Sequence, residues 1–147
     1  MMVEVQPMGS GPSLRRRRVG QRGEELAAAY LASHGYEVIA RNWRTRGGEL
    51  DIVARDGEWL VFVEVRARLV PQSWAEGEGQ AETLPMGLPE ESVTSRKQRR
   101  LAAMAEAYLG ERPWDGPWRI DVVAVQIRPD GSVARLNHLQ DAVTGSA

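Results

Sequence analysis

Two apolar segments that flank the dipeptide Asp56-Gly57 constrain the fold more than any other feature of this sequence. Residues 49–55 read ELDIVAR and residues 58–68 read EWLVFVEVRAR, and both are rich in the β-branched and aromatic residues that favour strands. Asp-Gly between two such runs is a strong signal for a two-residue β-hairpin. The sequence therefore predicts an antiparallel strand pair, and the second strand is apolar enough to be buried on both faces.

The remaining periodicity places helices and further strands around this hairpin. Apolar residues recur at helical spacing over residues 21–34 and 95–109, and strand-like runs cover residues 36–44, 119–128 and, more weakly, 133–139. The predicted order is therefore helix, three strands, helix and one or two strands, which is typical of an α/β protein.

Length and composition bound the classes of protein to consider. A chain of 147 residues is the length of one domain, and we expect that domain to cover residues 19–147. The absence of cysteine excludes disulfides and thiolate metal sites and suits a reducing compartment, so we expect a cytoplasmic protein. No apolar segment is long enough to suggest a membrane span, and we expect no membrane partner.

Two segments depart from the average charge of the chain. Residues 1–18 are polar and end in Arg15-Arg16-Arg17-Arg18, which we interpret as a disordered basic arm. Residues 69–93 contain acidic but no basic residues, together with several prolines and glycines, which predicts a flexible acidic loop. This loop is either a lid over a functional site or a solvated insertion without a role. Without it the net charge of −1 becomes positive.

The hairpin also predicts which carboxylates share a face of the sheet. If Asp56-Gly57 forms the loop, Asp51 faces Phe62 and Glu49 faces Glu64. Because side chains alternate along a strand, Glu49, Asp51 and Val53 are then expected on the face that carries Phe62 and Glu64. Asp51 and Glu64 become diagonal neighbours that are close enough to bind one ion. A register shift of one residue would separate them.

Glu64 lies within a run that is otherwise apolar, where an unpaired carboxylate is costly. One interpretation is a salt bridge from Glu64 to Arg66 or to another arginine. The other is a divalent metal with Asp51 and Glu64 as oxygen ligands and with water and substrate phosphate completing the coordination. Asp121 is a similar anomaly in residues 119–128, and pairing with Arg119 is the simpler explanation there.

The first predicted helix contributes a third carboxylate. At about 100° per residue, Glu24 lies within about 20° of Leu31, at the edge of the apolar stripe, while Glu25 points to solvent. Glu24 can therefore reach the interior. The alternative is that Glu24 only stabilises the positively polarised helix N-terminus.

The second predicted helix begins with cations, which oppose the helix macrodipole. They are Arg96, Lys97, Arg99 and Arg100, and Lys97 is the only lysine in the chain. Lys97 continues the apolar stripe one turn before Leu101, so we expect it to point toward the sheet. An anion would explain this placement, either a nucleic-acid phosphate or the carboxylate cluster. A solvated basic surface is the alternative.

Residues 20–128 contain the segment GQRGEELAAAYLASHGYEVIARNWRTRGGELDIVARDGEWLVFVEVRAR and the predicted helix that begins with KQRRL. On these motifs, residues 20–128 resemble the YraN family of predicted bacterial endonucleases. That family belongs with the restriction-endonuclease-like PD-(D/E)xK proteins, which are related to archaeal Holliday junction resolvases. The resemblance implies an α/β nuclease core with a mixed central sheet flanked by helices, which binds Mg²⁺ or Mn²⁺ and cuts DNA. It maps the family's acidic site residues onto Glu24, Asp51 and Glu64.

The sequence departs from the family pattern at Arg66, because EVRAR stands where the family has EVKxR. Arginine can clamp a phosphate oxygen and stabilise developing negative charge, but it cannot act as a base. Lys97 is a candidate substitute for the missing lysine. We also expect contacts to nucleic acid from the surrounding arginines, which are Arg44, Arg46, Arg68, Arg96, Arg99 and Arg100.

Three functions compete on these observations. The first is a metal-dependent DNA endonuclease, with branched or junction DNA as a candidate substrate. The second is a nuclease-like protein that binds nucleic acid without cutting it, which Arg66 favours. The third is an assembly partner that uses the acidic loop, with Trp74 as an anchor. The resemblance to junction resolvases also predicts a homodimer.

Overall fold

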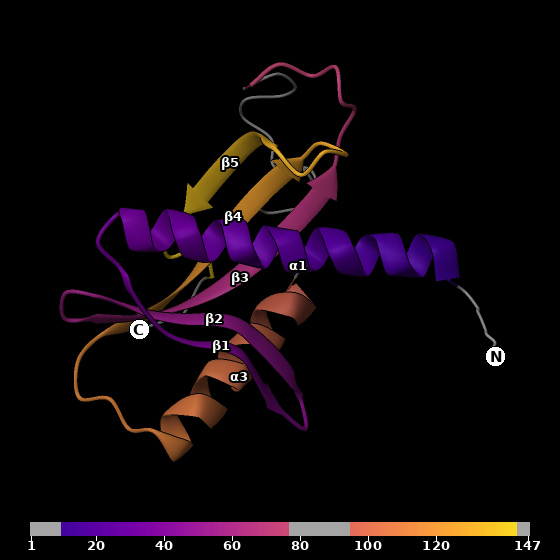
Figure 1. The fold of residues 1–147 in the computed structure, drawn as a ribbon. Coiled ribbons are helices and arrows are strands. Elements are labelled where there is room, and N and C mark those ends of the chain that lie inside the picture. Colours follow the sequence, from indigo (N-terminus) through magenta and orange to yellow (C-terminus); the bar gives the residue numbers. More distant parts are fainter. Residues whose placement is uncertain (1–9, 77–94, 144–147) are drawn as a thin grey trace, which may run out of the picture.

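The structure is a computed structural model in which residues 10–76 and 95–143 are described, the side chains of residues 10–13 excepted. Within these residues, a sheet of five strands lies between two helices (Figure 1). The elements in chain order are α1 (Ser10–Ser33), β1 (Glu37–Thr45), β2 (Gly48–Asp56), β3 (Trp59–Leu69), α3 (Ser95–Glu111), β4 (Trp118–Ile127) and β5 (Val133–Leu139). Within the described residues, no helix is long and apolar enough to cross a membrane.

The strands lie in the sheet in the order in which they occur in the chain. β3 and β4 are parallel, and every other neighbouring pair is antiparallel, so the sheet is mixed. A parallel pair needs a crossover, and α3 lies in the connection between β3 and β4. The predicted α/β fold with a mixed sheet flanked by helices is confirmed, and the arrangement is consistent with a nuclease-like core.

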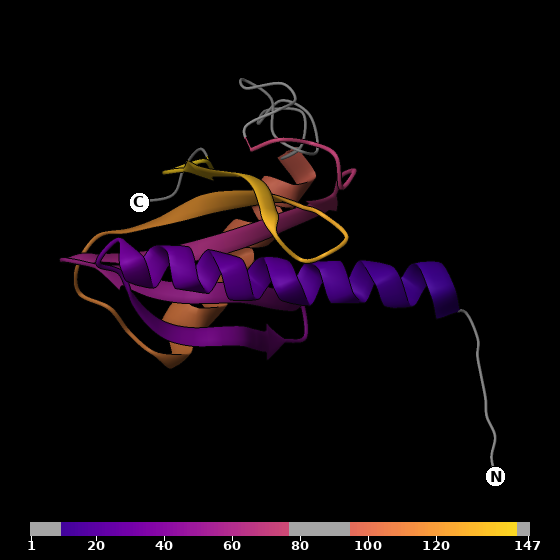
Figure 2. The ribbon, with the colours of Figure 1, turned by 45° about the horizontal axis from the view of Figure 1, so that its top comes forward.

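The two helices cover opposite faces of the sheet (Figure 2). On one face, Ala27 and Leu31 of α1 pack against alternate residues of β2, β3 and β4. On the other face, the α3 stripe of Leu101, Met104 and Tyr108 packs against the residues between them. β3 and β4 are buried on both faces because a helix lies on each, which explains their nearly continuous apolar sequences.

The helix α1 begins earlier than the sequence predicted. It starts at Ser10, so residues 10–18 are helical and the prediction of a disordered arm is wrong for them, while residues 1–9 lie outside the described part of the chain. Arginine is a good helix former, and no proline or turn signal separates Arg15–Arg18 from the apolar stripe that follows. Most of the predicted acidic loop also lies outside the described residues, because only residues up to 76 and from 95 onward are described.

The β2–β3 hairpin forms, but its register differs from the prediction. Asp56 pairs with Trp59, so Gly57 and Glu58 form the loop instead of Asp56-Gly57. Gly57 has φ 62°, the conformation that a type II′ turn requires at its first loop position. The register is therefore shifted by two residues, which leaves the assignment of side chains to faces unchanged across the paired part of the two strands.

Candidate metal and phosphate site

The candidate site lies where β2 separates from β3. The two strands pair from Asp56 and Trp59 as far as Ile52 and Val63, whereas β3 remains paired with β4 as far as Leu69. Beyond Ile52, β2 leaves the sheet core together with β1. The separation exposes the backbone of β3 from residue 64 onward, and it opens a fork into which side chains from β1, β2 and α1 project.

Asp51 lies at the point of this fork. Its Oδ2 accepts a hydrogen bond of 2.8 Å from the backbone N–H of Val65, a donor that a neighbouring strand would otherwise satisfy. The Asp51 carboxyl group therefore replaces a strand contact, which fixes its position.

Alternation along β2 breaks at the same residue. Leu50 and Val53 pack on the α3 face, while Ile52 packs on the α1 face. The expectation that Glu49, Asp51 and Val53 share one face is therefore wrong. A regular strand would place Leu50 and Ile52 on the same face, and the break turns Glu49 toward α1 instead.

Side-chain alternation along the neighbouring strand β1 also breaks opposite Asp51, because Ala40 and Trp43 both pack on the α3 face. Asn42 has φ 53°, a left-handed conformation that asparagine adopts more readily than most residues. It lies between Arg41, which pairs with Ile52, and Trp43, which pairs with Leu50. Its side chain turns toward α1, where Nδ2 donates hydrogen bonds of 2.9 Å to Glu24 and 2.7 Å to Glu49. Asn42 thus joins the helix to the strand.

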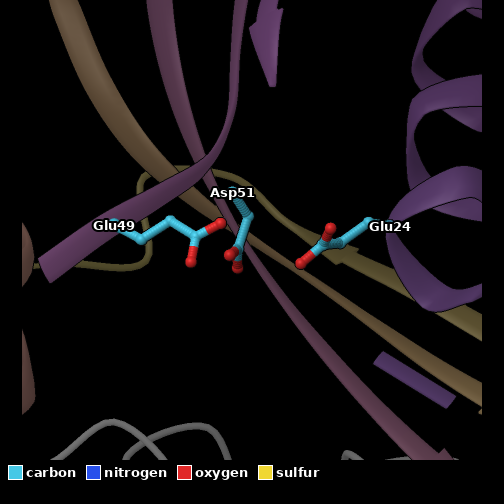
Figure 3. A group of neighbouring side chains, drawn as sticks. All are labelled: Glu24, Glu49 and Asp51. Atoms are coloured by element: carbon cyan, nitrogen blue, oxygen red, sulfur yellow. The ribbon is translucent and has the colours of Figure 1, made fainter. Parts of the chain in front are cut away.

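Glu24, Glu49 and Asp51 form an acidic cluster at this fork (Figure 3). Each offers a carboxylate oxygen, and these oxygens lie within 4.8 Å of one another. In Figure 3, Glu24 approaches from α1 and Glu49 from the opposite side, with Asp51 between them. Three half-buried carboxylates at this spacing form a group that could hold one metal ion.

The first helix reaches the cluster because it lies directly on β3. A side-chain carbon added to Gly23 would lie 2.6 Å from the Cβ atom of Ala67, so only glycine allows this approach. The next residue is Glu24, which is half-buried, whereas Glu25 is exposed and pairs with Arg22 at 3.4 Å. The predicted difference between the two glutamates is confirmed.

Burial and like charge oppose ionisation in the cluster. Burial raises the pKa of Asp51 to about 8, the charges of Glu64, Glu24 and Glu49 add to the rise, and the Val65 N–H opposes it. Without a cation, the folded protein therefore binds a proton at Asp51 that an exposed aspartate would have released.

Glu64 lies on the α3 side of Asp51. The two carboxyl groups are joined by a hydrogen bond, but Glu64 is outside the cluster of three. Burial raises the pKa of Glu64, although the charges of Arg66, Lys97 and Arg100 oppose this rise. The Arg66 Nη1 atom lies 3.7 Å from Glu64 Oε2, so the ion pair considered from the sequence is present.

Lys97 approaches Glu64 from the first turn of α3. Burial lowers the pKa of Lys97, the positive charge of Arg66 lowers it further, and Glu64 opposes the shift. Its side chain is half-buried, as expected for a residue that continues the apolar stripe of the helix. Arg66 is thus paired with Glu64, and the charge of Lys97 acts on the same carboxylate from a different element.

The arginines expected to contact nucleic acid are distributed around this fork. Arg44 lies 3.9 Å from Glu49 Oε1, with 78% of its side chain exposed. The other five are exposed, on the β1–β2 turn, at the end of β3 and on α3; they are Arg46, Arg68, Arg96, Arg99 and Arg100. Whether they bind nucleic acid stays a prediction.

Asp121 belongs to a different network, near the start of β4. It accepts hydrogen bonds of 2.9 Å from Arg119 Nε and from the Asp141 backbone, and His138 Nε2 lies 2.8 Å from its Oδ2. Burial acts to raise its pKa, but the bonds from His138, Arg119 and Asp141 hold the pKa of Asp121 below its ordinary value. Pairing with Arg119 explains this buried carboxylate.

Sequence reasoning missed Glu49 and Asn42 as members of the site. Glu49 carried a signal, because it lies two residues before Asp51 in a predicted strand, but the assumed register turned it toward Glu64. The signal at Asn42 was weaker. Asparagine is depleted in strands, and Asn42 interrupts the strand-like run YEVIARNWR. Its left-handed backbone could not be anticipated from one sequence.

Comparisons with known proteins place this chain in a family. A model described as "Uncharacterised protein family UPF0102" matches residues 23–125. A UPF0102 protein of Roseiflexus castenholzii is 44% identical over 131 residues, which cover 88% of this chain and 95% of that protein. A UPF0102 protein of Symbiobacterium thermophilum is 46% identical over 129 residues, 86% of this chain and 96% of that protein. The model covers most of the chain and the relatives match nearly end to end, so this protein belongs to the UPF0102 family, the YraN-type family that its motifs indicated.

Proposed function

We propose that this protein is a metal-dependent nuclease that hydrolyses phosphodiester bonds in DNA. The observation that carries the proposal is the cluster of Glu24, Glu49 and Asp51 at the fork between β2 and β3. A protein that only bound nucleic acid would gain nothing from converging carboxylates, since they repel phosphate unless a cation lies between them. Arginines and one lysine surround the cluster, so a cation site and a phosphate site adjoin.

The donor set fits Mg²⁺ or Mn²⁺. Carboxylate oxygens are the ligands that these hard cations prefer, and a site that offers few protein ligands leaves positions for water and phosphate. Glu24, Glu49 and Asp51 would hold the ion, with Glu64 beside Asp51. When bound, the cation would polarise the scissile phosphate and lower the pKa of an attacking water. Hydrolysis adds that water across one P–O bond and leaves one phosphate end and one hydroxyl end.

The remaining residues orient these groups and stabilise charge. Asn42 holds Glu24 and Glu49 through its amide. Arg66 offers its guanidinium to a phosphate oxygen once Glu64 turns to the cation. Lys97 provides a compact ammonium on the same side of the fork as Arg66. It could therefore replace the lysine that the family pattern has at the position of Arg66.

A second function is supported by one specific contact. Arg66 pairs with Glu64 at 3.7 Å, and only 14% of its side chain is exposed. If this pair persists when DNA binds, Glu64 cannot assist a cation, and the protein would bind nucleic acid without cutting it. Replacing Arg66 by lysine separates the two functions, because lysine restores the family pattern.

The test is a cleavage assay on linear, flapped and four-way DNA with Mg²⁺ or Mn²⁺. The wild-type protein is expected to cut at least one substrate, and Asp51→Ala and Glu24→Gln are expected to abolish cutting. Glu25→Gln is the matched control, because it removes the same charge from the adjacent, exposed position on α1. If no substrate is cut, the nuclease proposal fails and binding in EDTA supports the second function.

Two further variants test how the missing lysine is replaced. Lys97→Ala is expected to reduce cleavage, and Arg66→Lys to increase it. An increase with Arg66→Lys together with no change for Lys97→Ala would exclude Lys97 from the reaction.

The cellular setting and the assembly are part of the same proposal. We expect the enzyme to act in the cytoplasm and to form a homodimer, because two cuts on a two-fold junction suit a two-fold protein. Sedimentation with and without four-way DNA tests the dimer, and a monomer under both conditions would contradict it.

A further inference from the structure

A second concave surface lies on the other flank of α1 from the acidic cluster. At about 100° per residue, Arg22 and Glu24 point about 160° apart around the helix axis. A groove of about 700 Å³ lies on the Arg22 side, and residues of the N-terminal half of α1 and of the turn that joins β4 to β5 line it. We call it the α1 groove.

The floor of the α1 groove is apolar. Leu14, Val19, Leu69 and Ile127 line it. Leu14 is 42% exposed and Leu69 37% exposed, and they are two of the three large apolar side chains that are exposed among the described residues. Exposed apolar side chains that gather in one hollow indicate a surface that binds a partner.

The walls of the groove carry four arginines. Arg22 Nε donates a hydrogen bond of 3.1 Å to the Gly131 carbonyl oxygen, and Arg128 Nε donates one of 2.7 Å to the Trp74 carbonyl oxygen, so both help to build the walls. Arg15 and Arg18 form no hydrogen bond or ion pair within the described parts of the chain. Their guanidinium groups can therefore bind a ligand.

One acidic residue also lines the groove. Asp130 accepts hydrogen bonds from the Ser132 backbone N–H at 2.9 Å and from Gln72 Nε2 at 2.9 Å. Its carboxylate is thus bonded to the turn and to the segment after β3. Arg22 also pairs with Glu25 at 3.4 Å. The lining still carries more arginines than acidic residues, and Arg15 and Arg18 supply its excess positive charge, so its ligand is expected to be anionic.

We propose that the α1 groove binds single-stranded nucleic acid, with phosphates on Arg15 and Arg18 and bases on the apolar floor. One guanidinium group can donate two parallel hydrogen bonds to the oxygens of one phosphate. Bases stack on aromatic side chains and on arginine guanidinium groups in single-strand sites, and here the arginines and the aliphatic side chains of the lining would contact them. An acidic peptide would satisfy the arginines, but its carboxylate side chains would leave Leu14 and Leu69 uncovered.

The distance between the groove and the acidic cluster would allow one nucleic-acid strand to reach both. Nine residues of α1 separate Arg15 from Glu24, or about 14 Å along the helix axis. Along β3, five residues separate Glu64 from Leu69, or about 17 Å. At roughly 3.4 Å per stacked nucleotide, these axial separations set a minimum of about four or five nucleotides, because the groove and the cluster lie on opposite flanks of α1. This step rests on the proposed function: it implies a substrate with a single-stranded segment beside the scissile bond.

The test measures binding without cleavage. Labelled single-stranded 12-mers, duplexes of the same sequence, abasic 12-mers and a glutamate-rich peptide are titrated by fluorescence anisotropy in EDTA. The variant pair Arg15→Gln with Arg18→Gln is compared with Arg16→Gln and Arg17→Gln, which removes the same charge from adjacent positions of α1 that do not line the groove.

The expected results are specific to the groove. The Arg15/Arg18 pair is expected to weaken single-strand binding about tenfold and to reduce the slope of log K against log salt by about 1.4, since each phosphate contact contributes about 0.7. The Arg16/Arg17 pair is expected to change affinity less than about twofold, and abasic DNA to bind several-fold more weakly than the base-containing 12-mer.

Three outcomes would overturn this proposal. They are equal losses for the two arginine pairs, duplex binding as tight as single-strand binding, and peptide binding as tight as DNA binding. Because EDTA removes the cation, these outcomes do not depend on cleavage. A protein that cuts DNA but shows no groove effect would retain the proposed function and lose only this inference.

Discussion

The raised pKa of Asp51 predicts how the free energy of unfolding depends on pH, and this prediction can be tested without a substrate. The pKa of Asp51 rises from an ordinary value of 3.8 to about 8 in the folded protein, first because the carboxyl group is buried and then because Glu64 lies beside it. The folded protein therefore holds a proton that the unfolded chain has released at neutral pH. Since the folded state binds more protons, the free energy of unfolding falls as the pH rises toward 8.

The magnitude follows from the two pKa values. Between pH 6 and pH 8 the unfolded carboxyl group is fully ionised, while the folded group changes from protonated to half ionised. Integrating the difference in bound protons gives a loss of roughly 2 kcal/mol from this group. Asp51→Asn removes the titration, and its amide oxygen can still accept the Val65 N–H. The variant is therefore expected to lose roughly 2 kcal/mol less than the wild type over the same interval.

The assay is urea unfolding at pH 6, 7 and 8 in EDTA, followed by the fluorescence of the five tryptophans. The two proteins differ only at residue 51, so the difference between them reports the Asp51 carboxyl group together with its effect on the neighbouring Glu64. Asp115→Asn, at an exposed position between α3 and β4, controls for the loss of one negative charge.

Magnesium provides a second comparison. At pH 8, millimolar Mg²⁺ is expected to stabilise the wild-type protein and to leave Asp51→Asn nearly unchanged, because an ion that binds only the folded state shifts the equilibrium toward it. Parallel pH profiles for the wild type and Asp51→Asn would refute the raised pKa, whatever the protein does to DNA.

Three further changes test the approach of α1 to β3, the amide that joins Glu24 to Glu49, and the buried network of Asp121. Gly23→Ala is expected to be at least about 1 kcal/mol less stable than Gly20→Ala in thermal unfolding, because only the first forces α1 away from β3 and both gain the same helix propensity. Asn42→Gly keeps the left-handed backbone and removes both amide bonds, so calorimetry is expected to give about tenfold weaker Mn²⁺ binding with little loss of stability. Asp121→Ala is expected to cost about 3–5 kcal/mol in urea unfolding, because it leaves Arg119 without its closest buried partner, and a cost below 1 kcal/mol would contradict that role.

Most of the fold could be predicted because its signals are local. The strand runs lie between turn residues, and the α3 stripe of Leu101, Met104 and Tyr108 has clear helical spacing. The start of α1 was missed because four arginines have no apolar period, yet arginine favours a helix. The register was missed because Asp-Gly can occupy loop positions in more than one way, and the pairing of Asp56 with Trp59 depends on the whole sheet.

The sequence could predict most of the acidic residues of the candidate site, but not which of them lie together. Glu24 was expected at the edge of an apolar helix stripe and Asp51 beside Glu64 in the hairpin, and the structure brings Glu24 and Asp51 together. Glu64 lies beside Asp51, as expected, but Glu49 and not Glu64 completes the cluster of three. The difference arises at Asn42 and its neighbour across the strand pair, where both strands change faces, and such a break leaves no periodic signal in a single sequence.

Acidic and basic side chains lie on different sides of the fork. On the α1 side of the fork, Glu24 and Glu49 share the amide of Asn42. On the α3 side, Glu64 lies among Arg66, Lys97 and Arg100, whose charges oppose the rise in its pKa. Asp51 separates the two sides, so acids and bases are segregated within a few residues although the chain carries a net charge of only −1. A phosphate is therefore expected to approach from the α3 side and a cation from the α1 side. Binding of either ion alone should be weaker than binding of both, because each neutralises charge that repels the other.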